Sequence, residues 1–206
     1  MKKKNVKSIQ VPDGLISNQL REDNIKISPK TTYLYVWLKI LLTDYKTNTL
    51  TITPKELREN LKWKSKAILK NHLKTLKDLG YITYQDEFDN GNLQAHQPLM
   101  ITILSVKENF KKIRENVLLE KVMVSSSPEK AIRFCYLIRC YTNQEYGYCW
   151  LTYTQIREYG QIRREDIEEL IFELSRLKVI EVERGTFKYD SQNRYRKENN
   201  KYFLLI

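Results

Sequence analysis

The chain has 206 residues, of which 41% are hydrophobic, and its basic residues exceed its acidic residues to give a formal net charge of +11. This length accommodates two domains of ordinary size with a small core each. The excess positive charge favours an anionic partner. No apolar run reaches the roughly 18 residues of a membrane-spanning helix, and no signal-peptide core is present, so we predict no membrane partner.

The first part of the chain predicts a lead-in followed by two helices. Residues 1–26, which begin with Lys2-Lys3-Lys4, are expected to form a basic N-terminal arm and lead-in. A first helix is expected over residues 32–43, where apolar and aromatic residues are dense. A second begins at Thr53, which can serve as the N-cap and can form a capping box with Glu56.

The next segment is strongly basic. From Lys62 to Lys77 it carries six lysines and no acidic residue, and Leu69, Leu73 and Leu76 recur at the spacing of one helix face. Most of these lysines fall on the flank away from the leucines. A helix over residues 64–79 would therefore bury a leucine stripe and present a positive face to a polyanion.

A hairpin follows this lysine helix. The alternating residues 81–88, the turn Asn90-Gly91 and the return segment 99–104 predict two antiparallel strands. A helix, two further helices and a hairpin form the order of a winged helix, with the lysine helix in the recognition position. We predict a first winged-helix domain over residues 27–105.

The second half repeats this plan. Apolar residues of the lysine helix and the strand after it recur 98 residues later, and Thr152 with Gln155 forms a second capping-box pattern. Residues 128–206 are thus expected to form a second winged-helix domain. Residues 106–127 have apolar residues at near-helical spacing and are expected to form a linker helix, which either packs the domains together or serves as a dimer seam. The predicted fold class is α+β, mainly α with small β-hairpins.

The two halves differ in charge. The second candidate recognition helix, residues 161–177, has three arginines and five acidic residues, so phosphates should repel it and the acidic segment Glu165–Glu173 is a possible protein-binding surface. The wings invert this contrast. The predicted tip of the first wing is acidic, with Asp86, Glu87 and Asp89. The second wing is basic with interleaved tyrosines, and its residues are Arg184, Lys188, Arg194, Arg196, Lys197 and Lys201 with Tyr189, Tyr195 and Tyr202. This basic hairpin either binds the nucleic-acid backbone or minor groove, or its tyrosines pack on the second core.

Nothing in the sequence predicts catalysis, a cofactor or a metal site. Nucleotide-binding loops, nucleophile elbows and zinc-protease motifs are absent. Cys135, Cys140 and Cys149 lack paired spacing and are expected to be reduced thiols of a cytoplasmic protein. His72 flanks the leucine stripe, where it is a packing or phosphate-contact residue rather than a metal ligand.

Four segments of the first half carry a family resemblance. They look like the helix-turn-helix domains of plasmid and phage replication initiators and of related regulators of low-GC Gram-positive bacteria, and they are residues 11–16, 27–35, 53–57 and 76–82. The resemblance implies DNA binding. The tandem plan also resembles the two winged helices of plasmid initiators, although the acidic second helix departs from a scheme in which both copies grip DNA.

The function expected from the sequence is sequence-specific binding of double-stranded DNA by a non-enzymatic, cytoplasmic and nucleoid-associated homodimer. A repressor-like transcriptional regulator of a mobile element is the leading interpretation. Alternatives are a plasmid or phage replication initiator or replisome organiser, and a protein-interaction adaptor that does not bind DNA. The residues expected to contact DNA are Lys62, Lys64, Ser65, Lys66, Lys70, Asn71, Lys74, Lys77, Arg194, Arg196 and Lys197. Among them Asn71 is the candidate for a bidentate contact to adenine.

Overall fold

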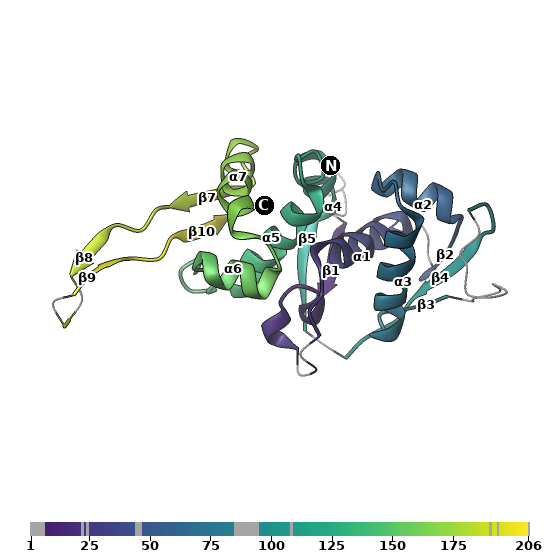
Figure 1. Cartoon of the computed structure of the whole chain (residues 1–206), viewed down its shortest axis with the longest axis horizontal. Coiled ribbons are helices and arrows are strands. Elements are labelled where there is room, and N and C mark those ends of the chain that lie inside the picture. The colour runs from purple at the N-terminus through teal and green to yellow at the C-terminus, as the bar shows by residue number, and fades with distance from the viewer. Residues whose placement is uncertain are drawn as a thin grey trace, which may run out of the picture.

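The computed structural model describes residues 7–21, 23, 25–43, 47–84, 95–107, 109–189, 191–192 and 194–205. The fold is α+β, as the sequence predicts, and one order of elements occurs twice along the chain (Figure 1). In each half a leading strand and short helical turns are followed by a long helix, a strand, two further helices and two strands of the same sheet, and in the second half β8 and β9 are inserted between those last two strands.

The first unit has its sheet in the order β2-β4-β3, with all neighbours antiparallel. Its elements are β1 (Ser8–Pro12), the short 3-10 turns η1 (Asp13–Leu15) and η2 (Asn18–Leu20), α1 (Pro29–Leu42), β2 (Thr49–Ile52), α2 (Pro54–Leu61), α3 (Lys66–Asp78), β3 (Ile82–Tyr84) and β4 (Leu99–Ile103). The predicted lysine helix and return strand are therefore present, each within a few residues of its predicted ends.

The second unit has the equivalent sheet order, β6-β10-β7, and a separate two-stranded ribbon of β8 and β9 that stands away from the body (Figure 1). Its elements are β5 (Phe110–Arg114), the short helical segments α4 (Glu115–Val117) and η4 (Leu118–Val122), α5 (Pro128–Tyr141), β6 (Tyr148–Trp150), α6 (Tyr153–Gly160), α7 (Arg164–Arg176), β7 (Ile180–Glu183), β8 (Phe187–Tyr189), β9 (Tyr195–Lys197) and β10 (Lys201–Leu204).

Both predicted capping boxes are confirmed. The Glu56 backbone N–H donates to Thr53 Oγ1 at 3.2 Å, and the Thr53 N–H donates to the Glu56 carboxylate at 2.9 Å. Thr152 and Gln155 make the same reciprocal pair, at 3.1 and 2.8 Å. Each of these helices ends at a left-handed residue, which turns the chain into the next helix.

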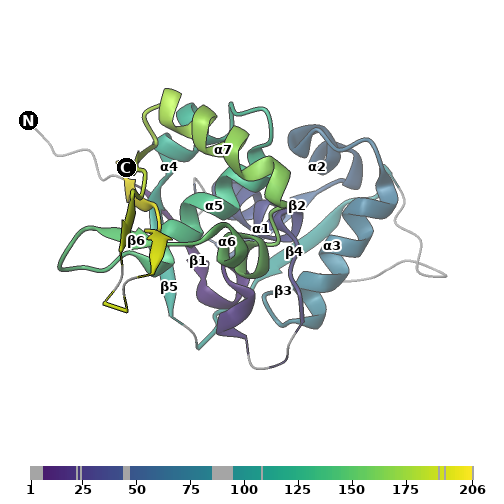
Figure 2. The ribbon, with the colours of Figure 1, turned by 60° about the vertical axis from the view of Figure 1, so that its left-hand side comes forward.

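The two units share one core. The leading strands β1 and β5 pair antiparallel, with buried Ile9 opposite buried Ile113, and α1 packs along α5 in the middle of the molecule (Figures 1 and 2). The Tyr136 hydroxyl of α5 donates to the Ile9 carbonyl oxygen at 2.9 Å. Buried residues of both units accordingly form a single hydrophobic cluster rather than two cores.

The prediction of a linker helix over residues 106–127 is wrong in its first half. Residues 110–114 form strand β5, and helical structure is confined to residues 115–122. The cause is pairing with β1, because a partner strand from the start of the chain satisfies the backbone of β5 and local periodicity cannot register such a contact. Phe110 and Val124, two of the apolar residues at near-helical spacing in this segment, are exposed.

The predicted arm and lead-in also needs correction. From Ser8 onward the segment belongs to the core, since Val11, Leu15 and Ile16 are completely buried. The lead-in reaches the second unit, where the Tyr141 hydroxyl lies 2.8 Å from Ser17 Oγ and donates to Gln19 at 3.0 Å. The Lys2-Lys3-Lys4 run lies outside the described residues.

Arg133 of α5 fixes this junction with a fully buried guanidinium group. It donates hydrogen bonds to five neutral oxygens, which are the carbonyls of Leu15, Ile27 and Tyr159, Thr32 Oγ1 and Asn18 Oδ1. Burial, followed by the charge of Arg21, lowers the pKa of Arg133 to about 9, so the group stays protonated at neutral pH. One side chain thus ties the lead-in, α1, α5 and the end of α6 together.

Replacing Arg133 with methionine should destabilise the protein by about 3 kcal/mol or more, because the carbonyls of Ile27 and Tyr159 and the hydroxyl oxygen of Thr32 would lose the donor that Arg133 supplies. Urea unfolding followed by circular dichroism measures this loss. Arg139→Met, at an exposed position of the same helix, is the matched control and should change stability little. Equal losses in the two variants would contradict the role assigned to Arg133.

Candidate nucleic-acid interface

Helix α3 is amphipathic in the way the sequence predicts. Leu69, Leu73 and Leu76 are completely buried. Ser65 is the N-cap, and its Oγ accepts from the Ile68 N–H at 3.4 Å. The Ser65 hydroxyl, expected as a DNA contact, therefore has a structural role at the start of the helix.

The turn before α3 is fixed by contacts to both units. Lys62 adopts φ 56°, and the Trp63 N–H donates to the Arg58 carbonyl at 2.9 Å. The Arg58 guanidinium donates to the Lys64 carbonyl at 3.0 Å. The Trp63 indole N–H reaches the Glu129 carboxylate at the start of α5, at 3.2 Å. The direction of α3 is thereby set against the second unit as well as against its own.

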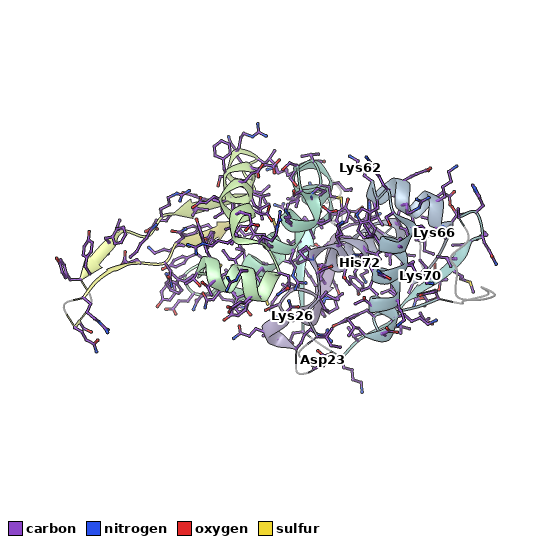
Figure 3. The ribbon with its side chains drawn as sticks, in the orientation of Figure 1. Asp23, Lys26, Lys62, Lys66, Lys70 and His72 are labelled. Atoms are coloured by element: carbon purple, nitrogen blue, oxygen red, sulfur yellow. The ribbon has the colours of Figure 1, made fainter. Side chains whose placement is uncertain are left out.

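The polar residues of α3 are distributed unevenly between solvent and protein. Figure 3 shows Lys66 and Lys70 on the side of the helix away from α1. Lys70 and Lys77 are partly buried, and the Lys77 ammonium lies 4.5 Å from the centre of the Tyr84 ring. Lys74 pairs with Asp78 at 3.4 Å, and both side chains are exposed. The predicted contact residues that are exposed around this helix are Lys62, Lys64, Lys66, Asn71 and Lys74.

His72 faces the protein rather than the solvent side of α3. Its Nδ1 lies 2.9 Å from Thr31 Oγ1, and its ring centre is 5.4 Å from that of Trp63. Burial, followed by the charge of Lys30, lowers the pKa of His72 to about 4, so the imidazole is neutral at neutral pH. Of its two predicted roles, packing agrees with this geometry.

In the equivalent helix of the second unit, α7, several acidic residues form hydrogen bonds or ion pairs with other residues of the chain. Glu173 accepts from the Ser126 N–H and hydroxyl, both at 2.8 Å. Asp166 pairs with Lys130 and Arg163, each at 2.9 Å, and Glu168 pairs with Arg184 at 2.9 Å. Hydrogen bonds from these basic groups lower the pKa of both Asp166 and Glu168. Phe172 of the same helix is 72% exposed.

The tyrosines of the basic hairpin in the second unit do not all have the same environment. Tyr202 is buried and its ring centre lies 5.7 Å from that of Phe134, so it packs on the core. Tyr189 and Tyr195 are exposed on the ribbon, away from the core. The ribbon, with Arg194 and Lys197 exposed, lies at the opposite end of the molecule from α3 (Figure 1). The predicted DNA-contacting residues therefore form two separate groups.

Some parts of the prediction fall elsewhere. The acidic residues of the predicted first wing tip, Asp86, Glu87 and Asp89, and the turn Asn90-Gly91 lie outside the described residues, as does the Arg196 side chain. Sequence reasoning missed the anchoring contacts of Arg58 and Trp63. A tryptophan inside a lysine-rich turn was the available signal, because a large aromatic ring there requires a place to pack.

Within the described ranges, no group of three or more histidine, cysteine or acidic side chains is placed to hold a metal ion. The helices in this part of the chain are all too short or too polar to cross a bilayer. The chain matches no protein-family model and has no significant match among curated proteins.

The low pKa of His72 predicts a pH-dependent stability. Its folded-state pKa of about 4 lies below the ordinary value of 6.5, so the unfolded chain binds the proton first and the contribution of neutral His72 is lost as pH falls from 6.5 toward 4. The thermal midpoint of the wild type should therefore drop more steeply over this window than that of His72→Gln. Parallel curves for the two proteins would refute the assignment.

Proposed function

We propose that the chain consists of two winged-helix units in tandem and that it binds double-stranded DNA without enzymatic activity. Support for the fold comes from the order helix, strand, helix, helix, strand, strand in both units, apart from the β8–β9 ribbon inserted between the last two strands of the second, with a three-stranded antiparallel sheet in each. In this interpretation α3 and α7 occupy the two recognition positions, and the β8–β9 ribbon is an extended wing.

The observation that carries the DNA proposal is the charge of α3. Its leucine face is buried while its solvent face and the turn before it carry the exposed Lys62, Lys64, Lys66 and Lys74 and the partly buried Lys70. A rigidly anchored helix therefore offers several cations to a phosphate backbone. The amino-terminal end of a helix also attracts anions through its N–H groups. In the major groove, lysines would position the helix and Asn71 would read a base.

A repressor-like regulator of a mobile element is the leading form of this proposal, and a replication initiator or replisome organiser is its alternative. Both use sequence-specific duplex binding in the cytoplasm, at the nucleoid. Homodimer formation, which a palindromic site would require, stays a prediction. Two pseudo-equivalent units already pair through β1 and β5 inside one chain, so a single copy also offers two unlike binding surfaces.

A second candidate function, a protein-binding adaptor, is favoured by one feature. Phe172 is 72% exposed on α7, with Glu165 and Glu169 also exposed on this helix. A large solvent-exposed ring among carboxylates suits a basic, amphipathic protein partner better than a phosphate backbone. In this candidate α7 holds the partner whether or not α3 binds DNA.

Replacing Lys66 and Lys70 together with alanine should weaken binding to all duplexes, because two phosphate contacts would be lost. The slope of log Kd against log salt concentration should fall by about 2. The wild type is first used to select bound duplexes from random and source-genome libraries at two salt concentrations. The affinities of the wild type and the variant for the enriched duplexes are then measured by fluorescence anisotropy.

The matched control for this charge removal is Arg157→Ala with Arg176→Ala, which removes two exposed positive charges from the second unit. It should leave affinity nearly unchanged. If both double variants weaken binding equally, α3 has no special role. If the wild type enriches no motif and its retention disappears at higher salt, the adaptor function takes precedence.

Asn71→Ala should mainly relax base preference. A bidentate amide contact to adenine discriminates by about 1 to 3 kcal/mol, whereas loss of one neutral side chain leaves the phosphate contacts intact. Repeating the selection with this variant should therefore return a motif that is degenerate at one position. An unaltered motif would show that Asn71 does not read a base.

A further inference from the structure

The β8–β9 ribbon projects from the second sheet on a well-defined base. The Glu198 N–H donates to the Thr186 carbonyl at 2.8 Å, and the Gly185 N–H donates to Asn200 Oδ1 at 3.2 Å. A Cβ atom at Gly185 would collide with the Glu198 carbonyl oxygen, so only glycine lets the two strands pass this closely. The ribbon thus extends away from the body, and contacts at its base hold it in this direction (Figure 1).

One face of the ribbon carries a continuous row of aromatic rings. Phe187, Tyr189 and Tyr195 are 57%, 68% and 62% exposed. Tyr195 stands in the middle, with its ring centre 5.2 Å from each of the other two, and it is stacked on Phe187 at an interplanar angle of 15°. Because Tyr189 pairs directly with Tyr195 and Phe187 lies two residues from Tyr189, all three share one face.

Cations accompany this aromatic row. Residues 184–201 contain six basic and two acidic residues, a net charge of +4. Lys188 is paired with Glu198 at 3.1 Å, and Arg184 is paired with Glu168 at 2.9 Å. Arg194, which precedes Tyr195 in the chain, and Lys197 are exposed, and Lys197 is the cross-strand partner of Phe187 and so shares the face of the aromatic row.

The chemistry of the ribbon specifies its partner. Three exposed rings in contact favour a flat, partly apolar ligand, and the positive charge beside them favours a polyanion. Bases stacked inside a duplex have their faces covered, whereas unpaired bases present a π-face and a phosphate at every nucleotide. We infer that the ribbon binds single-stranded DNA, with unpaired bases stacked on Phe187, Tyr195 and Tyr189 and with Arg194 and Lys197 beside the phosphates.

This inference deepens the proposed function and rests on the premise that the protein binds DNA. The ribbon and α3 lie at opposite ends of the long axis (Figure 1), so the two sites can hold different parts of one DNA molecule. A protein that holds duplex DNA at one end and an unpaired strand at the other favours the replication alternative over a repressor.

The test is fluorescence anisotropy of the full chain with a labelled oligothymidylate of about 20 nucleotides and with a duplex of the same length. The variant is Phe187→Ala with Tyr189→Ala and Tyr195→Ala, all at exposed positions. Its affinity for the oligothymidylate should fall by about 10-fold or more, while its duplex affinity should change less than about 2-fold. Circular dichroism verifies that the variant is folded.

Two further variants give matched controls. Tyr189→Phe with Tyr195→Phe keeps the rings and removes only the hydroxyls, so it should retain single-strand binding. Tyr146→Ala with Phe172→Ala removes two exposed rings elsewhere on the second unit and should also retain it. Unchanged affinity in the triple alanine variant, or an equal loss in the Tyr146 and Phe172 control, would overturn the inference.

The remaining outcomes separate this inference from the proposed function. Lys66→Ala with Lys70→Ala should lose duplex affinity and keep oligothymidylate affinity. Ring-dependent single-strand binding without any duplex binding would refute the groove-reading role of α3 and leave the ribbon site standing. Ring-dependent duplex binding without single-strand binding would overturn the ribbon site in favour of minor-groove insertion. Tighter, ring-dependent binding of oligouridylate would overturn its assignment to DNA.

Discussion

The buried guanidinium of Arg133 is the interaction on which the arrangement of the molecule depends. A positive charge without a carboxylate partner is tolerated in a protein interior only if oxygen atoms replace its lost water. Here those oxygens come from the lead-in, α1 and α6, all of which must be in position at once. The charge therefore favours a single way of joining the two units, and the antiparallel pairing of β1 with β5 supplies the backbone contacts that match it.

This junction also fixes α3, the helix that is proposed to bind DNA. Trp63, at the turn into α3, is held by Glu129 of α5, so the direction of α3 depends on the second unit even though its own leucines bury it in the first. In the proposed function, a helix that is fixed from both sides loses little freedom on binding, which lowers the entropic cost of placing its lysines against phosphates. The two units are thus one structural body with unlike surfaces.

Charge distinguishes the surfaces of the two related units. In the first, lysines lie on the solvent side of α3. In the second, carboxylates of α7 form ion pairs with neighbouring basic groups, and the exposed positive charge lies on the ribbon, beside exposed rings. Internal repetition supplies the scaffold twice, and divergence of the surface residues gives each copy a different class of ligand in the proposed function.

Local patterns in the sequence determined the helices and their caps, because capping boxes and leucine spacing act over three to four residues and depend little on the rest of the chain. The amphipathic lysine helix was predictable for the same reason. Other features join residues that are distant in the chain, so no local pattern predicts them. These are the pairing of β1 with β5, the burial of Arg133 and the contact of Trp63 with Glu129. The tertiary structure alone decided that the expected linker begins as a strand, that His72 faces the protein, and that the aromatic ribbon stands apart from α3.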